Sequence, residues 1–152
     1  MAICKYIDQI NDEKKLQPTG HQSRARLNQI ISMLDSYAYQ PMVWDVFVQR
    51  VVNPQEGKTS DESVISKAFP LIATVLAQLC QFLGTRNFLI GNSLSLADLH
   101  AFPMLLYFTK TPEGQRMLEK HGALYQWLAR MIERPSVVTT CSRYDSLSTR
   151  PK

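Results

Sequence analysis

The sequence has little cysteine, little glycine and no long apolar run, and each scarcity excludes a class of protein. Its three cysteines, Cys4, Cys80 and Cys141, are far apart and lack a C-x-x-C spacing. They predict neither a disulfide framework nor a zinc knuckle, and they favour a reducing, cytoplasmic location. The six glycines do not cluster into a loop that could cradle a phosphate. No stretch approaches the roughly 20 apolar residues that cross a bilayer, and no signal-peptide core opens the chain, so we expect no membrane association.

Signatures of catalysis, metal binding and nucleic-acid binding are also sparse. The formal net charge is +4, but the lysines and arginines are scattered among acidic residues, so we expect no nucleic-acid partner. The three histidines, His21, His100 and His121, lie too far apart for metal-ligand spacing, and we expect no metal site. No G-x-S-x-G nucleophile motif occurs. The sequence therefore offers no catalytic residue.

What the sequence does contain is helical apolar periodicity in a chain of one-domain length. Its 152 residues are 45% apolar, which is enough to fill a single core. No strand-like alternation recurs and the connectors are short, so the sequence predicts an all-α bundle of about five to six helices. The segment 96–109 has hardly any polar face and is expected at the centre. The other predicted helices cover residues 3–10 and 27–52, the latter with a kink at Pro41. The next runs from a Thr59/Glu62 capping box to Gly84. The last two cover residues 112–121, closed by Gly122, and residues 124–134.

The stretch from Gly91 to Leu99 encodes a helix start. Ser95 fits the N-cap, and its hydroxyl can accept from the N–H of Asp98, while the Asp98 carboxylate can accept from the N–H of Ser95. Leu94 and Leu99 occupy the positions of a hydrophobic staple. This pattern explains the carboxylate of Asp98 as a structural group, so we do not expect it to be a catalytic acid.

Four short segments occur in an order and at separations that suggest a family. They are Ala2–Ile7, Arg24–Arg26, the capping box Ser95–Asp98, and Arg134–Val137. They resemble, in turn, the helix that ends the thioredoxin-like domain of glutathione transferases, the start of their long bundle helix, the start of their central helix and the end of their last helix. The chain thus resembles the C-terminal helical domain of the glutathione S-transferase family. Residues 1–140 would form this domain, 1–16 being a remnant of the interdomain helix and connector, and 141–152 an irregular tail.

The resemblance carries expectations about activity and partners. In this family the residue that activates the glutathione thiol lies on the thioredoxin-like domain, and this sequence contains no βαβ half. We expect the chain to lack conjugating activity alone, and to use glutathione only if such a domain is supplied. The alternative is a non-catalytic module that binds another protein or a small apolar ligand. We also expect the apolar stripe of the first helix, Ile3, Tyr6, Ile7 and Ile10, to be exposed and to support a homodimer or docking of a thioredoxin-like domain.

One aromatic cluster fits a ligand-binding wall. Its residues are Ser36, Tyr37, Tyr39 and Trp44, grouped around the proline of the long helix. Core packing is the ordinary use of such residues. The resemblance implies instead that this stretch, together with Tyr107 on the central helix, lines the hydrophobic co-substrate side of the active cleft. Residues two apart in an α-helix point about 200° apart, so we expect only one of the two tyrosines in the wall unless the proline unwinds the turn.

Overall fold

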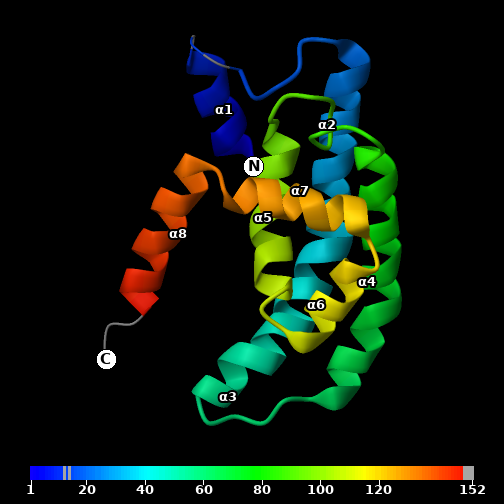
Figure 1. Cartoon of the computed structure of the whole chain (residues 1–152), viewed down its shortest axis with the longest axis vertical. Coiled ribbons are helices and arrows are strands. Elements are labelled where there is room, and N and C mark those ends of the chain that lie inside the picture. Colours follow the sequence, from blue (N-terminus) through cyan, green and yellow to red (C-terminus); the bar gives the residue numbers. More distant parts are fainter. Residues whose placement is uncertain (12, 14, 149–152) are drawn as a thin grey trace.

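The computed structural model describes residues 1–11, 13 and 15–148, with side-chain surroundings up to residue 141. Within these residues the chain forms helices and one isolated antiparallel bridge, between Phe88 and Gly91 (Figure 1). The predicted all-α fold class is therefore confirmed. The elements are α1 (Ala2–Ile10), α2 (His21–Met33), η1 (Leu34–Val52), α3 (Asn53–Gln55), α4 (Glu62–Leu83), α5 (Leu96–Phe108), α6 (Pro112–Glu119), α7 (Gly122–Ile132) and α8 (Pro135–Ser148).

Helix α5 lies at the centre of the bundle, as its apolar sequence predicts. It packs against α2, η1 and α7, and α4 packs against η1 and α7 (Figure 1). Ala101, Leu105 and Phe108 are fully buried on one side of α5, and Phe102 and Met104, which point about 200° apart around the helix, are buried as well. Burying one side chain of the size of Leu or Phe contributes about 1.5–3 kcal/mol. An apolar circumference therefore specifies a helix that other helices surround.

The long helix is continuous from α2 into η1, but η1 is a π-helix instead of a kinked α-helix. The N–H of Asn53 donates to the carbonyl oxygen of Val48, five residues earlier, where an α-helix would use the fourth. Pro41 is buried inside η1 and donates no backbone hydrogen bond. Four of the other buried residues of this segment are spaced four apart, at Leu34, Ala38, Met42 and Val46. These residues contribute to the core where η1 packs against α4 and α5.

Helix α4 begins and ends at residues with clear local causes. Asp61 is the N-cap, and its carboxylate accepts from the N–H of Ser63 at 2.9 Å and of Val64 at 3.3 Å. The predicted Thr59/Glu62 capping box is therefore wrong, because the aspartate between them takes the cap. Gly84 ends the helix with φ at 54°, a conformation that favours glycine. Among the described residues α4 is the one helix long and apolar enough to cross a membrane by length and composition, and its apolar side forms part of the core.

The C-terminal region differs from the prediction in two places. Gly122 starts α7 and does not close α6, which ends at Glu119. The segment predicted as an irregular tail from residue 141 continues as α8 to Ser148, and residues 149–152 lie outside the described residues. Pro135 suits the first helical position because its fixed φ matches the helix and it lacks an N–H. Val137 is buried and Cys141 packs partly buried against the core, so α8 is held to the bundle although its sequence shows no apolar period.

Candidate functional site

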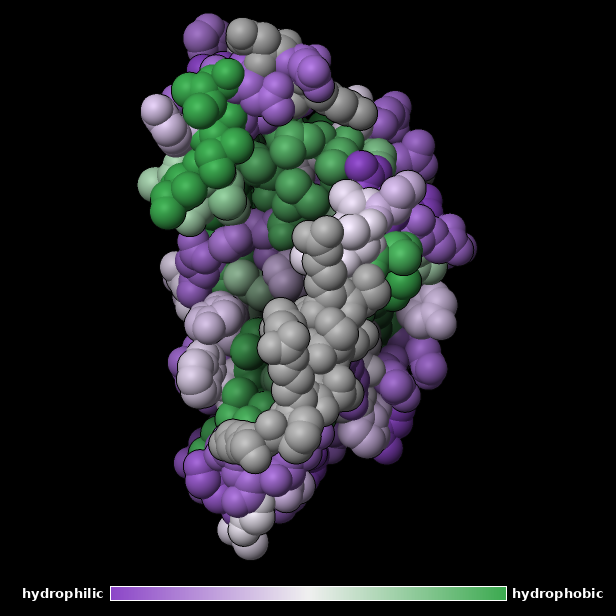
Figure 2. Space-filling view, turned by 90° about the vertical axis from the view of Figure 1, so that its left-hand side faces the viewer, coloured by the Kyte–Doolittle hydropathy of each residue, from purple (hydrophilic) through white to green (hydrophobic). Residues whose placement is uncertain are grey.

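The outer side of α1 is the most exposed apolar surface among the described residues. Ile3, Tyr6, Ile7 and Ile10 expose 74%, 62%, 54% and 62% of their surface, as the sequence led us to expect. At about 100° per residue these four side chains fall within one sector of the helix. Figure 2 shows apolar side chains gathered at the α1 end of this face of the molecule. Contiguous exposed apolar patches mark surfaces that another molecule or domain covers.

The inner side of α1 is polar and is fixed by hydrogen bonds. Asp8 is buried, and its carboxylate accepts from the N–H of Leu16 at 2.5 Å and from the N–H and side-chain amide of Gln17 at 3.1 and 3.0 Å. Burial alone would raise the pKa of Asp8, but these hydrogen bonds outweigh it and hold the pKa below its usual value. Lys5 also donates to Asn28 of α2 at 2.7 Å. Polar contacts therefore hold α1 with its apolar side facing outward.

The residues predicted for the co-substrate wall are placed in separate surroundings. Tyr37, Tyr39 and Trp44 project from η1, each with roughly half of its surface exposed. Ser36 lines a hollow of about 330 Å³ between η1 and α4. That hollow also contains Gln40, Asp45 and Lys67, and none of the predicted aromatic residues lines it. The exposed wall and this polar hollow are therefore different features.

Tyr107, the fifth residue predicted for the wall, contacts a second aromatic residue that the sequence did not indicate. Its ring lies 4.8 Å from the ring of Phe47 on η1, tilted by 40°. The ammonium group of Lys110 lies 5.4 Å from the centre of the same Tyr107 ring. Tyr107 thus has both an aromatic neighbour and a nearby cation, and each contact is attractive. The pairing joins residues from two helices, and helical periodicity alone does not reveal it.

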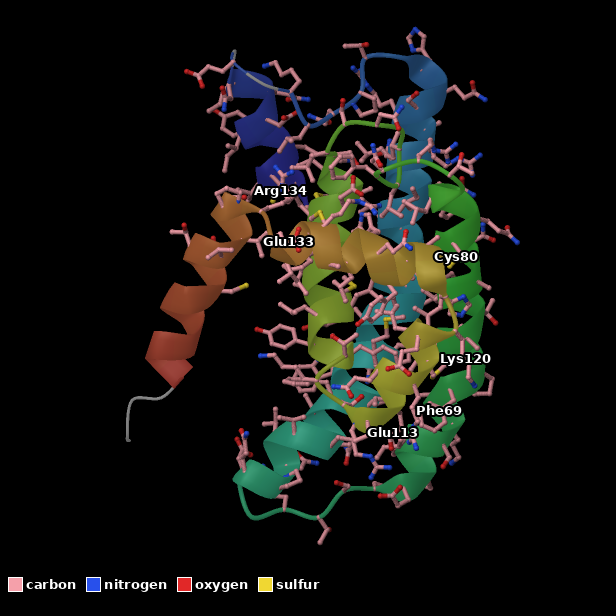
Figure 3. The ribbon with its side chains drawn as sticks, viewed as in Figure 1. Phe69, Cys80, Glu113, Lys120, Glu133 and Arg134 are labelled. Carbon is pink, nitrogen blue, oxygen red and sulfur yellow. The ribbon has the colours of Figure 1, made fainter. Side chains whose placement is uncertain are left out.

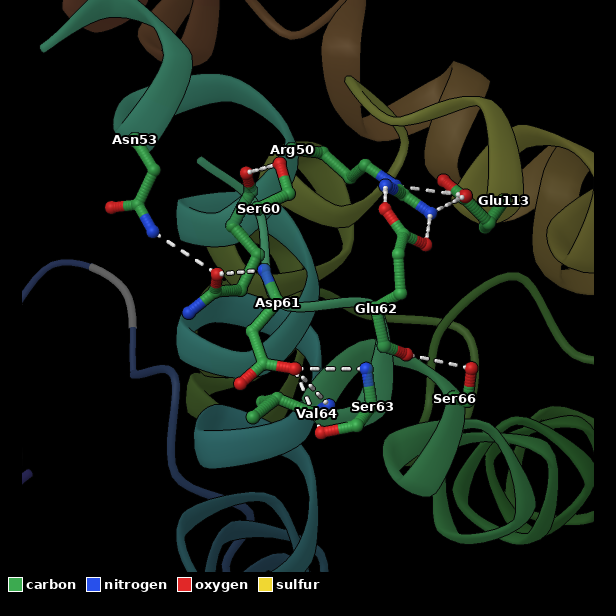
Figure 4. Close-up of polar contacts among 10 residues, drawn as sticks. Arg50, Asn53, Ser60, Asp61, Glu62, Ser63, Val64, Ser66 and Glu113 are labelled. Carbon is green, nitrogen blue, oxygen red and sulfur yellow. Dashed lines mark hydrogen bonds and ion pairs between the residues drawn. The ribbon is translucent and has the colours of Figure 1, made fainter. Parts of the chain in front are cut away.

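An ion-pair network fixes the end of η1 that follows the wall. Arg50 binds the carboxylate of Glu62 at the start of α4 through two nitrogens, and it reaches Glu113 of α6 at 2.8 and 2.9 Å (Figure 4). The hydrogen bonds that Arg50 donates to Glu62, and then those to Glu113, raise the pKa of Arg50. The Arg50 hydrogen bond likewise lowers the pKa of Glu62. Three helices are thereby joined at one guanidinium group.

The hollow beside Glu113 belongs to the same end of the bundle. Its volume is about 570 Å³. Phe69 of α4, Glu113 and Met117 of α6, and Lys120 directly after α6 contribute to its lining. Figure 3 shows Phe69, Glu113 and Lys120 on these two neighbouring helices. One oxygen of Glu113 is buried without a hydrogen-bond partner, while the other binds Arg50. The charges of this hollow are mixed, with acidic and basic residues alternating along α6.

The capping residues of α5 form a buried polar centre. Asp98 is fully buried, and its carboxylate accepts from the N–H and hydroxyl of Ser95 at 3.0 and 2.6 Å. It also accepts from the N–H of Leu89 and from the indole N–H of Trp127, both at 2.9 Å. Ser95 and Asp98 make the capping box, with Leu94 half-buried and Leu99 exposed by 36%. One carboxylate thus connects α5 to the preceding loop and to α7.

The remaining titratable pairs do not form a metal centre. Within the described residues, no group of three or more His, Cys, Asp or Glu side chains could hold a metal ion. The Cys80 sulfur lies 3.4 Å from a ring nitrogen of His121, and burial raises the pKa of this thiol. His100 lies 2.6 Å from Asp35, connecting α5 to η1. Each is a pair of two groups between neighbouring helices.

Comparison with known proteins identifies this arrangement. Residues 39–135 match the family model for the C-terminal domain of glutathione S-transferase. The chain is 26% identical to glutathione S-transferase F7 of Arabidopsis thaliana over 137 residues, which cover 89% of this chain and 65% of the relative. It is 27% identical to glutathione S-transferase 1 of Zea mays over 136 residues, which cover 90% and 63%. The chain therefore spans less than two thirds of the length of these relatives.

Solved structures agree with the sequence relatives. Glutathione S-transferase III in its apo form superposes with a TM-score of 0.82 at 25% identity, over 93% of this chain and 65% of the other. Maize glutathione S-transferase I in complex with an atrazine glutathione conjugate gives a TM-score of 0.78 at 26% identity, over 93% and 65%. The family model covers well over half of the chain. The chain belongs to the glutathione S-transferase family, and its bundle is the C-terminal helical domain of that family.

Proposed function

We propose that this bundle supplies the hydrophobic co-substrate side of a glutathione transferase site, and that glutathione itself is held by a thioredoxin-like domain docked beside it. The observation that carries the proposal is the outward apolar side of α1, on a bundle that matches the family's C-terminal domain. Related proteins are glutathione transferases, and one related structure contains a glutathione conjugate of atrazine. Residues 1–16 then correspond to the last helix of the thioredoxin-like domain and its connector.

The aromatic residues support an apolar co-substrate. Tyr37, Tyr39 and Trp44 offer amphipathic surface on η1, and Tyr107 with Phe47 extends it to α5. Aromatic side chains provide large contact area and polar tips that orient a ligand. A docked thioredoxin-like domain would close the open side of this wall. The substrate class is therefore an electrophile with an apolar body.

Thiol activation is the step that we assign to the docked thioredoxin-like domain. Glutathione must lose its thiol proton to attack an electrophile, and the family places the activating residue on the thioredoxin-like domain. Residues 1–152 alone should therefore bind glutathione weakly and not accelerate its conjugation.

A chimaera tests the proposal. In the chimaera, the thioredoxin-like half of maize glutathione S-transferase 1 replaces α1 and is joined directly ahead of residue 11. The assay measures conjugation of glutathione to a generic chloronitrobenzene. We expect turnover by the chimaera and none by residues 1–152. A Tyr107→Ala chimaera should raise KM for the electrophile while leaving KM for glutathione unchanged. Turnover by residues 1–152 alone, or a folded, glutathione-binding chimaera without turnover, would contradict the proposal.

A second candidate function is a non-catalytic interaction module, and the same exposed side of α1 favours it. In that case the apolar stripe would bind a partner protein or a second copy of the chain, and no glutathione would be used. The chimaera separates the two functions, because an interaction module would not yield turnover when the thiol-activating half is restored. The cytoplasmic location expected from the unpaired cysteines suits both functions.

A further inference from the structure

The segment between α3 and α4 contains a threonine to which neither the fold nor the proposed function gives a role. Thr59 does not form the capping box that the sequence predicts, because Asp61 caps α4. Residues 58–61 lie outside any helix, and the backbone of Asp61 is extended, with φ at −92° and ψ at 102°. Residues 54–59 are all exposed, and Figure 1 shows this segment at the end of the molecule opposite α1. Thr59 is therefore accessible from solution on extended chain.

The hydroxyl group of Thr59 is free, whereas the neighbouring hydroxyl groups are engaged. Three of these donate hydrogen bonds of 2.5–2.7 Å within the protein, and they belong to Ser60, Ser63 and Ser66 (Figure 4). None of the described residues forms a hydrogen bond with the side chain of Thr59. In residues 59–66, Thr59 is thus the one hydroxyl that can react without first breaking an internal contact.

Carboxylates follow this hydroxyl along the chain. Asp61 is the second residue after Thr59 and Glu62 is the third, and both are exposed. The hydrogen bond from Ser63 lowers the pKa of Asp61, and the one from Arg50 lowers the pKa of Glu62, so both groups are ionised at neutral pH. Protein kinases select substrates partly by charge pattern. A free threonine followed by two carboxylates fits the kinases that present basic residues to the chain after the acceptor hydroxyl.

Glu62 can turn toward a kinase at little cost, although it also pairs with Arg50. Its side chain is 67% exposed, whereas that of Glu113, the other carboxylate on Arg50, is 14% exposed. Exposed ion pairs contribute only about 0–1 kcal/mol. When Glu62 leaves, Arg50 keeps its hydrogen bond to Glu113 at 2.9 Å, so no buried charge loses its partner. The carboxylate at the third position is therefore available for recognition.

We propose that Thr59 is a phosphorylation site for an acid-directed serine/threonine kinase. The hydroxyl oxygen of Thr59 forms a bond to the γ-phosphorus of ATP, and the bond from that phosphorus to the β-phosphate oxygen breaks. ADP leaves, and the hydroxyl proton passes to the catalytic aspartate of the kinase. The modified residue gains a charge of nearly −2 at neutral pH. The proposal does not depend on the transferase function, and the site lies far from the apolar side of α1.

The test uses residues 1–152 in the folded state. The protein is incubated with ATP, Mg²⁺ and the catalytic subunit of casein kinase II, an acid-directed kinase, and peptide mass spectrometry locates the phosphate over time. We expect Thr59 to be modified about tenfold faster than any serine of residues 60–66, since each of those must first lose an internal hydrogen bond. Phosphate on one of these serines in preference to Thr59, or none on the segment, would overturn the proposal.

Matched variants test the role of the carboxylate. Glu62→Gln should slow modification of Thr59 about tenfold, the effect of losing one charge-assisted hydrogen bond to the kinase, and Glu62→Asp should restore most of the rate. Glu56→Gln is the control, because it removes an exposed carboxylate three residues before Thr59 and should leave the rate nearly unchanged. Circular dichroism establishes that each variant is folded. If Glu62→Gln and Glu56→Gln slow the reaction equally, net charge alone governs the rate and the proposal is wrong.

Discussion

Removal of the Asp98 carboxylate should destabilise the bundle far more than the loss of an ordinary helix cap. Asp98→Ala leaves four buried donors without their acceptor: the N–H of Leu89, the N–H and the hydroxyl of Ser95, and the indole N–H of Trp127. Each unsatisfied buried donor costs about 1–3 kcal/mol, whereas an exposed cap is worth about 1 kcal/mol. Because water can enter part of the space, we expect a loss near the lower limit of that sum, about 4 kcal/mol.

Neighbouring variants separate the contributions. Ser95→Ala removes a hydroxyl that donates to Asp98 at 2.6 Å and should cost about 1 kcal/mol. Trp127→Phe removes the indole N–H from a fully buried position and should cost about 1–2 kcal/mol. In the double variant Asp98→Ala/Trp127→Phe no indole N–H is left without an acceptor. The double variant should therefore lose about 1–2 kcal/mol less free energy of unfolding than the two single variants lose together.

Urea unfolding followed by circular dichroism at 222 nm measures these free energies without relying on tryptophan fluorescence. A common slope for wild type and variants allows the midpoints to be compared directly. If Asp98→Ala costs less than about 1.5 kcal/mol, the carboxylate acts as an ordinary cap. If the double variant shows strict additivity, the Trp127 contact carries no coupling, and the reasoning about orphaned donors is wrong.

Three further predictions follow from the charged groups. Glu113→Gln should lower stability by about 1–2 kcal/mol because Glu113 and Arg50 are mostly buried, whereas Glu56→Gln in the exposed pair with Lys58 should cost no more than about 0.5 kcal/mol in the same urea assay. The pKa values of Asp61 and Glu62 are lowered in the folded state, so their stabilisation is present above about pH 4.5 and is lost as pH falls through the folded values. Urea midpoints at pH 6, 4 and 3 should therefore fall less for Asp61→Asn/Glu62→Gln than for wild type. Under iodoacetamide, peptide mass spectrometry should find Cys4 alkylated well before Cys80, since Cys4 is exposed and burial raises the pKa of Cys80; equal rates would contradict the placement of Cys80.

Most helices were predictable because their apolar residues recur at the α-helical period. The central position of α5 follows from its apolar circumference, and the Gly84 stop follows from glycine's freedom at positive φ. The π-helical η1 was not predicted, because a four-residue step between apolar positions also occurs in an α-helix and does not distinguish the two helix types. Helix α8 was missed because it lacks a recurring apolar side, the residues that pack on the core being Val137 and, partly buried, Cys141.

The long-range partners of the site were beyond the reach of sequence spacing. Trp127 and Asp98 are 29 residues apart, and Arg50 and Glu113 are 63 apart. Local patterns reveal that Asp98 suits a capping box, but they do not reveal that a second helix also donates to it. The apolar stripe of α1 was visible, whereas the buried Asp8 that holds it outward was not. The pairing of Phe47 with Tyr107 likewise required the packing of η1 against α5.

The outward apolar side of α1 is the central claim, because both proposed functions require that another surface covers it. Sedimentation velocity of residues 1–152 over a concentration series up to tens of micromolar tests it most directly, with the variant Ile3→Asp/Ile7→Asp beside the wild type. We expect the isolated chain to form a dimer or larger assembly through this stripe, and the variant to be monomeric, since burying two unpaired carboxylates is costly. A wild-type protein that stays a monodisperse monomer, or a dimer that the variant leaves unchanged, would contradict the assignment of α1 as the docking surface.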